Sequence, residues 1–195
     1  MGGITNETVH LSFAVDWSKE VNPLLYNNGN YNANEVLIDF EINRSVLDYL
    51  IQFIKENNID IELSYKELEK KRFNSEIEDD YVIFISQKNS KEYKSALFTN
   101  LAAHIPNIKK DEHLDFPIPS NLDTVIKLVA YFSTSYKNNF DINEINKNPI
   151  LIRIKSIGRK NTTTYRTIKA YLGNIFIFDE NAKKPSYALG IATNY

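Results

Sequence analysis

The 195-residue chain contains no cysteine. This absence excludes a disulfide framework, a thiolate zinc site, an iron–sulfur cluster and a cysteine nucleophile. It also suits a reducing compartment. Because the first six residues offer neither the basic nor the apolar region of a secretory signal, we expect a soluble, cytoplasmic protein.

Glycine and long apolar runs are scarce as well. The chain has only six glycines, and it contains neither G-x-G-x-x-G nor G-x-x-x-x-G-K-[ST], nor a G-x-S-x-G elbow. We therefore expect no Walker-type NTPase, no dinucleotide enzyme, no α/β-hydrolase and no cofactor. No apolar run approaches the roughly 20 residues that span a bilayer, so we expect no membrane partner.

The residues that are present are typical of a folded domain. Hydrophobic residues make up 43% of the chain and charged residues 25%, which excludes wholesale disorder. The length favours one domain over residues 1–195. The asparagine-dense segment 27–34 predicts a surface loop.

Hydrophobic periodicity predicts the elements of residues 1–149. Alternation indicates strands over 9–16 and 36–42, and the apolar run 81–85 indicates a strand in the centre of a sheet. Apolar residues at helical spacing predict helices over 46–55 and 122–135.

Further local signals concern the starts of helices and the segments between the elements. Ser45-x-x-Asp48 and Ser120-x-x-Asp123 resemble capping boxes. We also expect a short charged helix over 65–72, an acidic turn at 76–80 and a helix from Ser90 to about His104.

Residues 150–195 have a different pattern, because alternating segments are separated by turn residues. This pattern predicts an antiparallel meander. Its strands are expected at 150–157, 163–172, 175–179 and 187–192, with turns at 158–161, 173–174 and 180–185. The fold class is therefore α+β: a single domain with a mainly antiparallel sheet, about three helices and a C-terminal β-meander.

One carboxylate pattern points to metal-dependent chemistry. Asp80 precedes the apolar strand and Glu92-x-Lys94 follows it, which resembles the D…(D/E)-x-K signature of the PD-(D/E)XK nuclease family. The resemblance implies two carboxylates that hold a divalent ion and a lysine that positions water. Glu69-x-Lys71 matches the signature equally well, and the proline before Asp80 is missing. The alternative interpretation is an acidic turn and an acid in the first turn of a helix.

A second cluster could hold a metal ion. Asp111, Glu112, His113 and Asp115 offer carboxylates and an imidazole within five residues, and His104 lies nine residues before His113. Solvated loop acids and a packed or capping histidine are the simpler interpretation. We therefore expect no metal and keep His113, Asp111 and Asp115 as a weak candidate.

Charge is segregated along the chain. The net charge is −2, yet residues 150–172 contain six basic residues and no acidic one. Strand alternation predicts that the isoleucines of this segment face the core. It therefore places basic and aromatic side chains together on the outer face of the sheet. The residues of this expected surface are Arg153, Lys155, Tyr165, Lys169 and Tyr171.

These observations favour a non-catalytic binding protein. A basic and aromatic face suits an acidic partner, and the slightly acidic chain favours a protein over a nucleic acid. An inhibitor, an immunity protein or a mobile-element accessory protein would fit this function. The alternative function is a divalent-metal-dependent nuclease that uses Asp80, Glu92 and Lys94. A catalytic site requires acids that converge in a pocket, whereas a binding protein requires a broad exposed surface.

Overall fold

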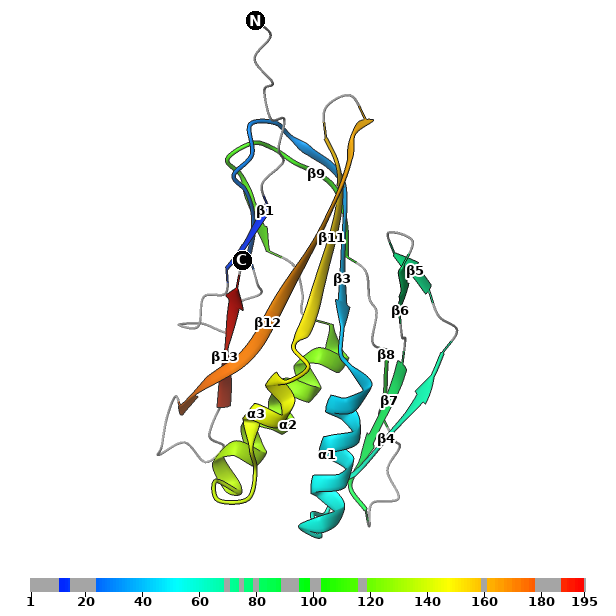
Figure 1. Ribbon diagram of the computed structural model, residues 1–195, viewed down its shortest axis with the longest axis vertical. Helices are drawn as coiled ribbons and strands as arrows, with labels where there is room; N and C mark the ends of the chain where they lie inside the picture. Colours follow the sequence, from blue (N-terminus) through cyan, green and yellow to red (C-terminus); the bar gives the residue numbers. More distant parts are fainter. Residues whose placement is uncertain are drawn as a thin grey trace, which may run out of the picture. The chain divides into compact units, whose positions relative to one another are not determined.

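The computed structural model divides into two compact units (Figure 1). The first unit comprises 1–39, 102–118 and 152–167, and the second comprises 40–101, 119–151 and 168–195. The residues that the structure describes are 11–14, 24–68, 71–73, 76–78, 81–88, 95–98, 103–115, 119–158, 161–177 and 187–194.

A small antiparallel sheet in the first unit has the strand order β1-β2-β10. Its strands are β1 (Leu11–Ala14), β2 (Leu24–Asn27) and β10 (His113–Asp115). Leu25 of β2 is opposite Phe13 on one side and Leu114 on the other. The side chain of Leu25 is fully buried, so the centre of this sheet contributes to the core.

A second sheet has the order β13-β12-β11-β3-β9. Because β11, β12 and β13 are neighbours in the order in which they occur in the chain, the predicted C-terminal meander is confirmed. No α-helix occurs in the described part of 150–194. The strands are β3 (Ala33–Glu41), β9 (Ala103–Ile108), β11 (Ile150–Ile157), β12 (Thr163–Ile177) and β13 (Tyr187–Asn194).

The turn expected at 173–174 is wrong. The chain continues through Gly173 as one long strand, β12, and its register with β13 shifts between Gly173 and Ile175. Such a shift is a β-bulge, which inserts an extra residue into one strand without reversing the chain. Turn residues within an alternating pattern therefore marked a bulge here.

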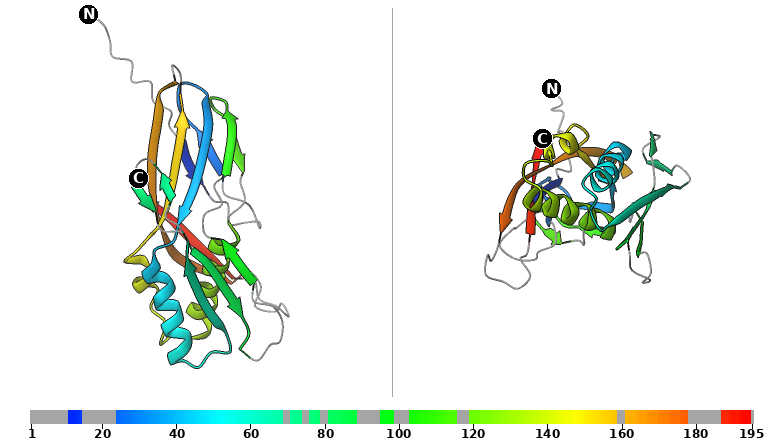
Figure 2. Two further views of the ribbon diagram at one scale, coloured as in Figure 1. Left: turned by 90° about the vertical axis from the view of Figure 1, so that its right-hand side faces the viewer. Right: turned by 90° about the horizontal axis from the view of Figure 1, so that it is seen from below.

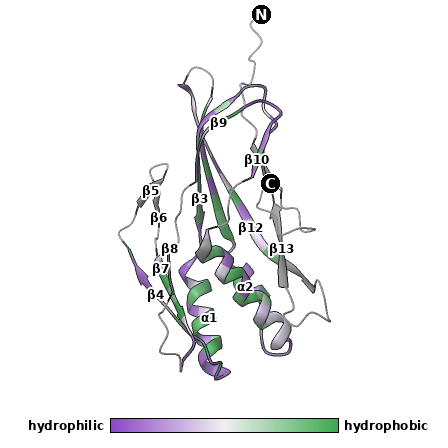
Figure 3. Cartoon of the chain, turned by 180° about the vertical axis from the view of Figure 1, so that it is seen from behind, coloured by the Kyte–Doolittle hydropathy of each residue, from purple (hydrophilic) through white to green (hydrophobic). Residues whose placement is uncertain are grey.

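Helix α1 (Arg44–Glu56) confirms the helix predicted over 46–55 and buries one apolar face (Figure 3). Its N-cap is Asn43, whose side chain accepts a hydrogen bond from the Ser45 backbone N–H at 2.9 Å. The expected capping role of Ser45 and Asp48 is therefore wrong. The buried residues of the helix are Val46, Leu47, Leu50, Phe53 and Ile54.

The C-terminus of α1 closes with a left-handed residue. Asn58 has φ 49°, and the backbone N–H of Ile59 donates to the carbonyl oxygen of Ile54 at 3.0 Å. This bond is the defining contact of a Schellman motif, which satisfies carbonyl groups that the helix leaves without partners. Ile59, the first residue after this motif, is buried.

Helix α2 (Ser120–Ser135) confirms the helix predicted over 122–135. Pro119 is in the N-cap position and no side chain caps the helix, so the capping box expected at Ser120 is wrong. The short helix α3 (Ile142–Asn146), which the sequence pattern did not reveal, begins at its N-cap Asp141. An aromatic cluster packs the helices together. The ring centroid of Phe53 lies 5.1 Å from that of Phe132 and 4.9 Å from that of Phe140.

A third antiparallel sheet, with the order β4-β7-β8, lies beside α1 and α2 (Figure 2). The strand predicted over 81–85 is confirmed as its centre. The helices expected over 65–72 and 90–104 are wrong, because strands occupy described parts of both segments. The strands are β4 (Glu62–Glu67), β7 (Tyr81–Ser86) and β8 (Ser95–Phe98).

The last sheet is the antiparallel pair of β5 (Lys71–Phe73) and β6 (Glu76–Glu78). Strand β6 occupies the described part of the segment 76–80, where an acidic turn had been expected. Helices and antiparallel strands thus occur in separate segments of the chain, which confirms the α+β fold class. Among the residues with described positions, no helix combines the length and apolar character that a membrane span requires.

Candidate functional site

The hairpin of β11 and β12 carries the basic segment. Its turn is closed by the backbone N–H of Gly158, which donates to the carbonyl oxygen of Thr162 at 2.8 Å. Asn161 adopts φ 59° within the turn, a conformation that asparagine tolerates better than most residues. The turn therefore sets which residues of the two strands face each other.

Alternation along the hairpin is clear on β12. Three residues at alternate positions are buried: Ile168, Ala170 and Leu172. Thr167, which precedes Ile168, and Lys169, which lies between Ile168 and Ala170, are exposed. The isoleucines at positions 150, 152 and 154 of β11 are also buried, as the sequence predicted. The inward-facing residues are thus those expected from period-2 alternation.

Arg153 departs from that expectation. Its side chain is only 8% exposed, so its predicted place on an exposed surface is wrong. The reason is that β11 is an inner strand between β12 and β3, and both faces of an inner strand can be covered. Asp39, which is 6% exposed, is a buried acid on the neighbouring strand β3.

In the first unit, the remaining residues of the predicted surface are Lys155, which is half-buried, and Tyr165, which is exposed. The Nζ atom of Lys155 lies 5.8 Å from the centroid of the Tyr165 ring, within the range of a cation–π contact. Tyr165 is 41% exposed, one of three large apolar residues with such exposure in the described chain. A cation and an exposed aromatic ring therefore lie together on the hairpin.

The other two residues of the predicted surface belong to the second unit. Lys169 is exposed and Tyr171 is half-buried. Their participation in a binding surface stays a prediction.

The weak metal candidate is not assembled. Among the residues that the structure describes, no three His, Asp or Glu side chains form a group that could hold an ion. The ring of His113 lies 5.3 Å from that of Tyr26, its partner in the β2–β10 register. The Nε2 atom of His104 instead lies 2.6 Å from Oε2 of Glu35. His104 and His113 thus each have a neighbour within their own sheet.

The nuclease candidates Asp80, Glu92 and Lys94 lie outside the described residues. The strands that follow them in sequence are antiparallel, with Val82 opposite Phe98 and Ile85 opposite Ser95. The nuclease alternative stays a prediction.

Asn27 is a structural residue that the sequence interpretation missed. Its Nδ2 donates to the carbonyl oxygens of Tyr31 and Ile108 at 2.9 and 3.0 Å, and its Oδ1 accepts from Gly29 N–H at 3.1 Å. The side chain is fully buried, so the start of the expected surface loop is anchored in the core. Asn27-x-Gly29 is an Asx-turn signal, which could have indicated this role.

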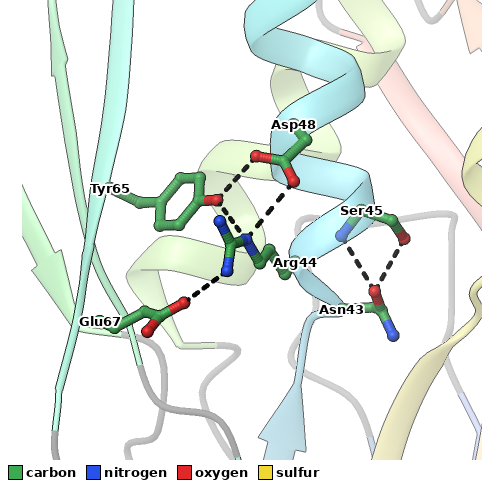
Figure 4. Close-up of polar contacts among 6 residues, drawn as sticks. All are labelled: Asn43, Arg44, Ser45, Asp48, Tyr65 and Glu67. Carbon is green, nitrogen blue, oxygen red and sulfur yellow. Dashed lines mark hydrogen bonds and ion pairs between the residues drawn. The ribbon is translucent and has the colours of Figure 1, made fainter.

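A polar cluster joins β4 to the first turn of α1 (Figure 4). Arg44 donates to the Tyr65 hydroxyl and to Glu67 at 2.8 Å each, and Tyr65 donates to Asp48 at 2.7 Å. Withdrawal from water and the hydrogen bond to Asp48 raise the pKa of Tyr65, so the phenol is protonated at neutral pH. Both carboxylates of the cluster, Asp48 and Glu67, form ion pairs with Arg44, and we assign the cluster a structural role.

A shallow hollow of about 400 Å³ opens in the second unit beside α2. Its charged residues, Asp123 and Lys127, form an ion pair of 2.7 Å, so the rim does not select a charged ligand. The hollow is lined by Ile61, Ile85, Asp123, Thr124, Lys127, Leu128 and Tyr131. The Lys155–Tyr165 pair, in contrast, lies in a segment with charge of one sign.

Comparison of the chain with models of protein families, with curated proteins and with solved structures finds no match. The candidate surface therefore rests on the geometry and charge of the chain itself.

Proposed function

We propose that the chain is a non-catalytic binding protein that engages an acidic protein partner through the hairpin of β11 and β12. The observation that carries the proposal is the contact between half-buried Lys155 and exposed Tyr165, whose Nζ atom and ring centroid lie 5.8 Å apart. This pair lies in a segment with six basic and no acidic residues.

Two physical properties favour this surface. Tyrosine supplies a large contact area with little conformational freedom to lose, and it is enriched among the residues that dominate binding energies. Lysine charges attract an acidic partner over distances of about a Debye length, near 8 Å at physiological salt. The ring also holds the Lys155 ammonium close to the strand, which limits the entropy lost on binding.

A protein partner is favoured over a nucleic acid. The whole chain carries a net charge of −2, which opposes general attraction to a polyanion. The sequence also lacks the signature of an RNA-recognition module. A cytoplasmic inhibitor, immunity protein or mobile-element accessory protein would use such a surface, and the cysteine-free composition suits that compartment.

The proposal is tested with poly-L-glutamate as the acidic probe and a single-stranded oligonucleotide as the comparison. We expect salt-sensitive binding of poly-L-glutamate that Lys155→Glu weakens by about tenfold. Lys137→Glu, which reverses an exposed lysine outside the hairpin, is the matched control and should leave binding nearly unchanged. Equal binding by both variants, or preference for the oligonucleotide, would contradict the proposed function.

A further inference from the structure

The segment Asn27-Asn28-Gly29 contains a dipeptide that is prone to spontaneous chemical change. In an asparagine–glycine pair, the backbone nitrogen of the glycine can attack the side-chain carbonyl carbon of the asparagine, because glycine has no side chain to hinder the approach. Asn28 is exposed, so water reaches its side chain. The reaction would convert its amide into a carboxylate at the start of the asparagine-dense segment.

The reaction has two steps, and water is its co-reactant. The Gly29 nitrogen forms a bond to Cγ of Asn28, the bond from Cγ to Nδ2 breaks, and the amide proton of Gly29 leaves with Nδ2 as ammonia. Water then opens the cyclic succinimide at either of its carbonyl groups, which produces aspartate or isoaspartate. The first step requires that the Gly29 N–H group can lose its proton and turn toward the Asn28 side chain.

In the structure, the Gly29 N–H group is engaged elsewhere. It donates to Oδ1 of Asn27 at 3.1 Å, and both residues are buried. The Asn27 side chain is itself fixed, because its Nδ2 donates to the carbonyl oxygens of Tyr31 and Ile108 at 2.9 and 3.0 Å. Breaking a buried hydrogen bond costs more than breaking an exposed one. The residue that precedes Asn28 therefore holds the attacking nitrogen.

The backbone of Asn27 keeps this arrangement in place. Its N–H donates to the carbonyl oxygen of Glu112, and its carbonyl oxygen accepts from the N–H of Asp111, both at 2.9 Å. All of these residues belong to the first unit. Backbone and side chain together thus tie Asn27 to the segment 108–112.

We infer that Asn28 is a modification site that the Asn27 side chain suppresses: the hydrogen bond from Gly29 N–H to Asn27 Oδ1 slows deamidation of Asn28 in the folded chain. Opening of this turn releases the attacking nitrogen. The product, a carboxylate or a longer isoaspartyl backbone, then lies next to buried Asn27. The inference does not depend on the proposed function, since the reaction involves only residues 27–29 and water.

The test follows deamidation at Asn28 by peptide mapping with mass spectrometry during incubation at neutral pH. The reference is a synthetic peptide of residues 24–32, which is too short to fold stably. We expect the full chain to deamidate about tenfold more slowly than the peptide or slower still, since one hydrogen bond corresponds to roughly this factor in rate. The Gly29 N–H should also be protected from hydrogen exchange.

Two substitutions separate the hydrogen bond from the anchoring of the loop. Asn27→Ala removes both the acceptor for Gly29 and the donors to Tyr31 and Ile108, so it should raise the deamidation rate about tenfold. Asn27→Asp keeps the acceptor but lacks the donors, and it should stay near the wild-type rate. Asn28→Ala, the control, should give no signal at this site. Urea unfolding of each variant gives its unfolded fraction, whose contribution to the rate is subtracted.

The outcomes decide the inference. Equal rates in the full chain and the peptide overturn it, and so does equal acceleration by Asn27→Ala and Asn27→Asp, because the anchoring of the loop would then account for the slow reaction. If the aspartate variant does not fold, as its melting curve would show, hydrogen exchange decides instead. Fast exchange of the Gly29 N–H in the wild type overturns the inference, and slow exchange that Asn27→Ala accelerates supports it.

Discussion

The side-chain amide of Asn146 pairs with both backbone groups of Leu172. Its Nδ2 donates to the Leu172 carbonyl oxygen at 2.7 Å, and its Oδ1 accepts from the Leu172 N–H at 2.9 Å. Leu172 directly precedes the bulge at Gly173, and β11 begins only at Ile150. The side-chain amide of Asn146 thus takes the place of a neighbouring strand beside Leu172. This bonding supports the strand directly before Gly173 and Asn174, the two residues at which a turn was expected.

We expect Asn146→Ala to destabilise the protein by about 1–3 kcal/mol, because it leaves two part-buried backbone groups without partners. Urea unfolding followed by circular dichroism measures the change. Asn138→Ala, in an exposed turn, is the control and should have little effect. A loss of less than about 0.5 kcal/mol, the usual range of surface substitutions, would show that water replaces the amide.

We expect Asn58→Gly to stabilise the protein by about 0.5–1 kcal/mol, because glycine adopts the left-handed conformation at a helix C-terminus without a Cβ penalty. Asn58→Ala, which retains a Cβ atom, should not stabilise it. Thermal unfolding of the three proteins provides the comparison. If the glycine variant melts at or below the wild-type temperature, the left-handed conformation carries no strain at this position.

We expect Arg153→Met to destabilise the protein by about 3–5 kcal/mol, because Arg153 is a buried charge and its removal would leave the group that compensates it buried without a counter-charge. Asp39 is the buried acid that we expect to be coupled to it, so Asp39→Leu/Arg153→Met should recover most of the loss. Lys155→Met, two residues further along β11, is the control. Additive effects of the two single substitutions would mean that another group compensates the guanidinium.

We expect the purified chain to cleave neither DNA nor RNA in the presence of Mg²⁺ or Mn²⁺, because the proposed function is binding without catalysis. A gel assay with both metals tests this expectation. Cleavage by the wild type that is lost in Asp80→Ala and in Glu92→Ala, with unchanged melting temperatures, would establish the nuclease alternative instead.

The sequence correctly predicted those helices and strands in which apolar residues recur at a regular spacing. The apolar residues of α1 recur at helical spacing, and the alternation of 150–157 and 163–172 is that of half-buried strands. The segment 90–104 was misassigned because a charged stretch after Ser90 resembles a helix start. Its described residues instead pair with β7 and β3, and such long-range pairing overrides weak local preference.

The sequence also predicted part of the candidate site correctly and part of it wrongly. The six-to-zero charge imbalance and the strand alternation indicated Lys155 and Tyr165, which lie together on the hairpin. The same alternation predicted an exposed side chain for Arg153, which is buried in the structure. A period of two separates the faces of a strand, but it does not reveal what covers each face.

The sequence by itself determined the α+β class, the two long helices and the C-terminal meander, because these depend on interactions within a few residues or on a sustained period. It also determined the absence of cysteine chemistry and the location of the positive charge. Only the tertiary structure decided the burial of Arg153, the anchoring of Asn27 and the continuation of β12 through Gly173. Asn27 and Leu172 each depend on a partner more than 20 residues away, Ile108 and Asn146, and the packing around a strand is likewise set by distant segments.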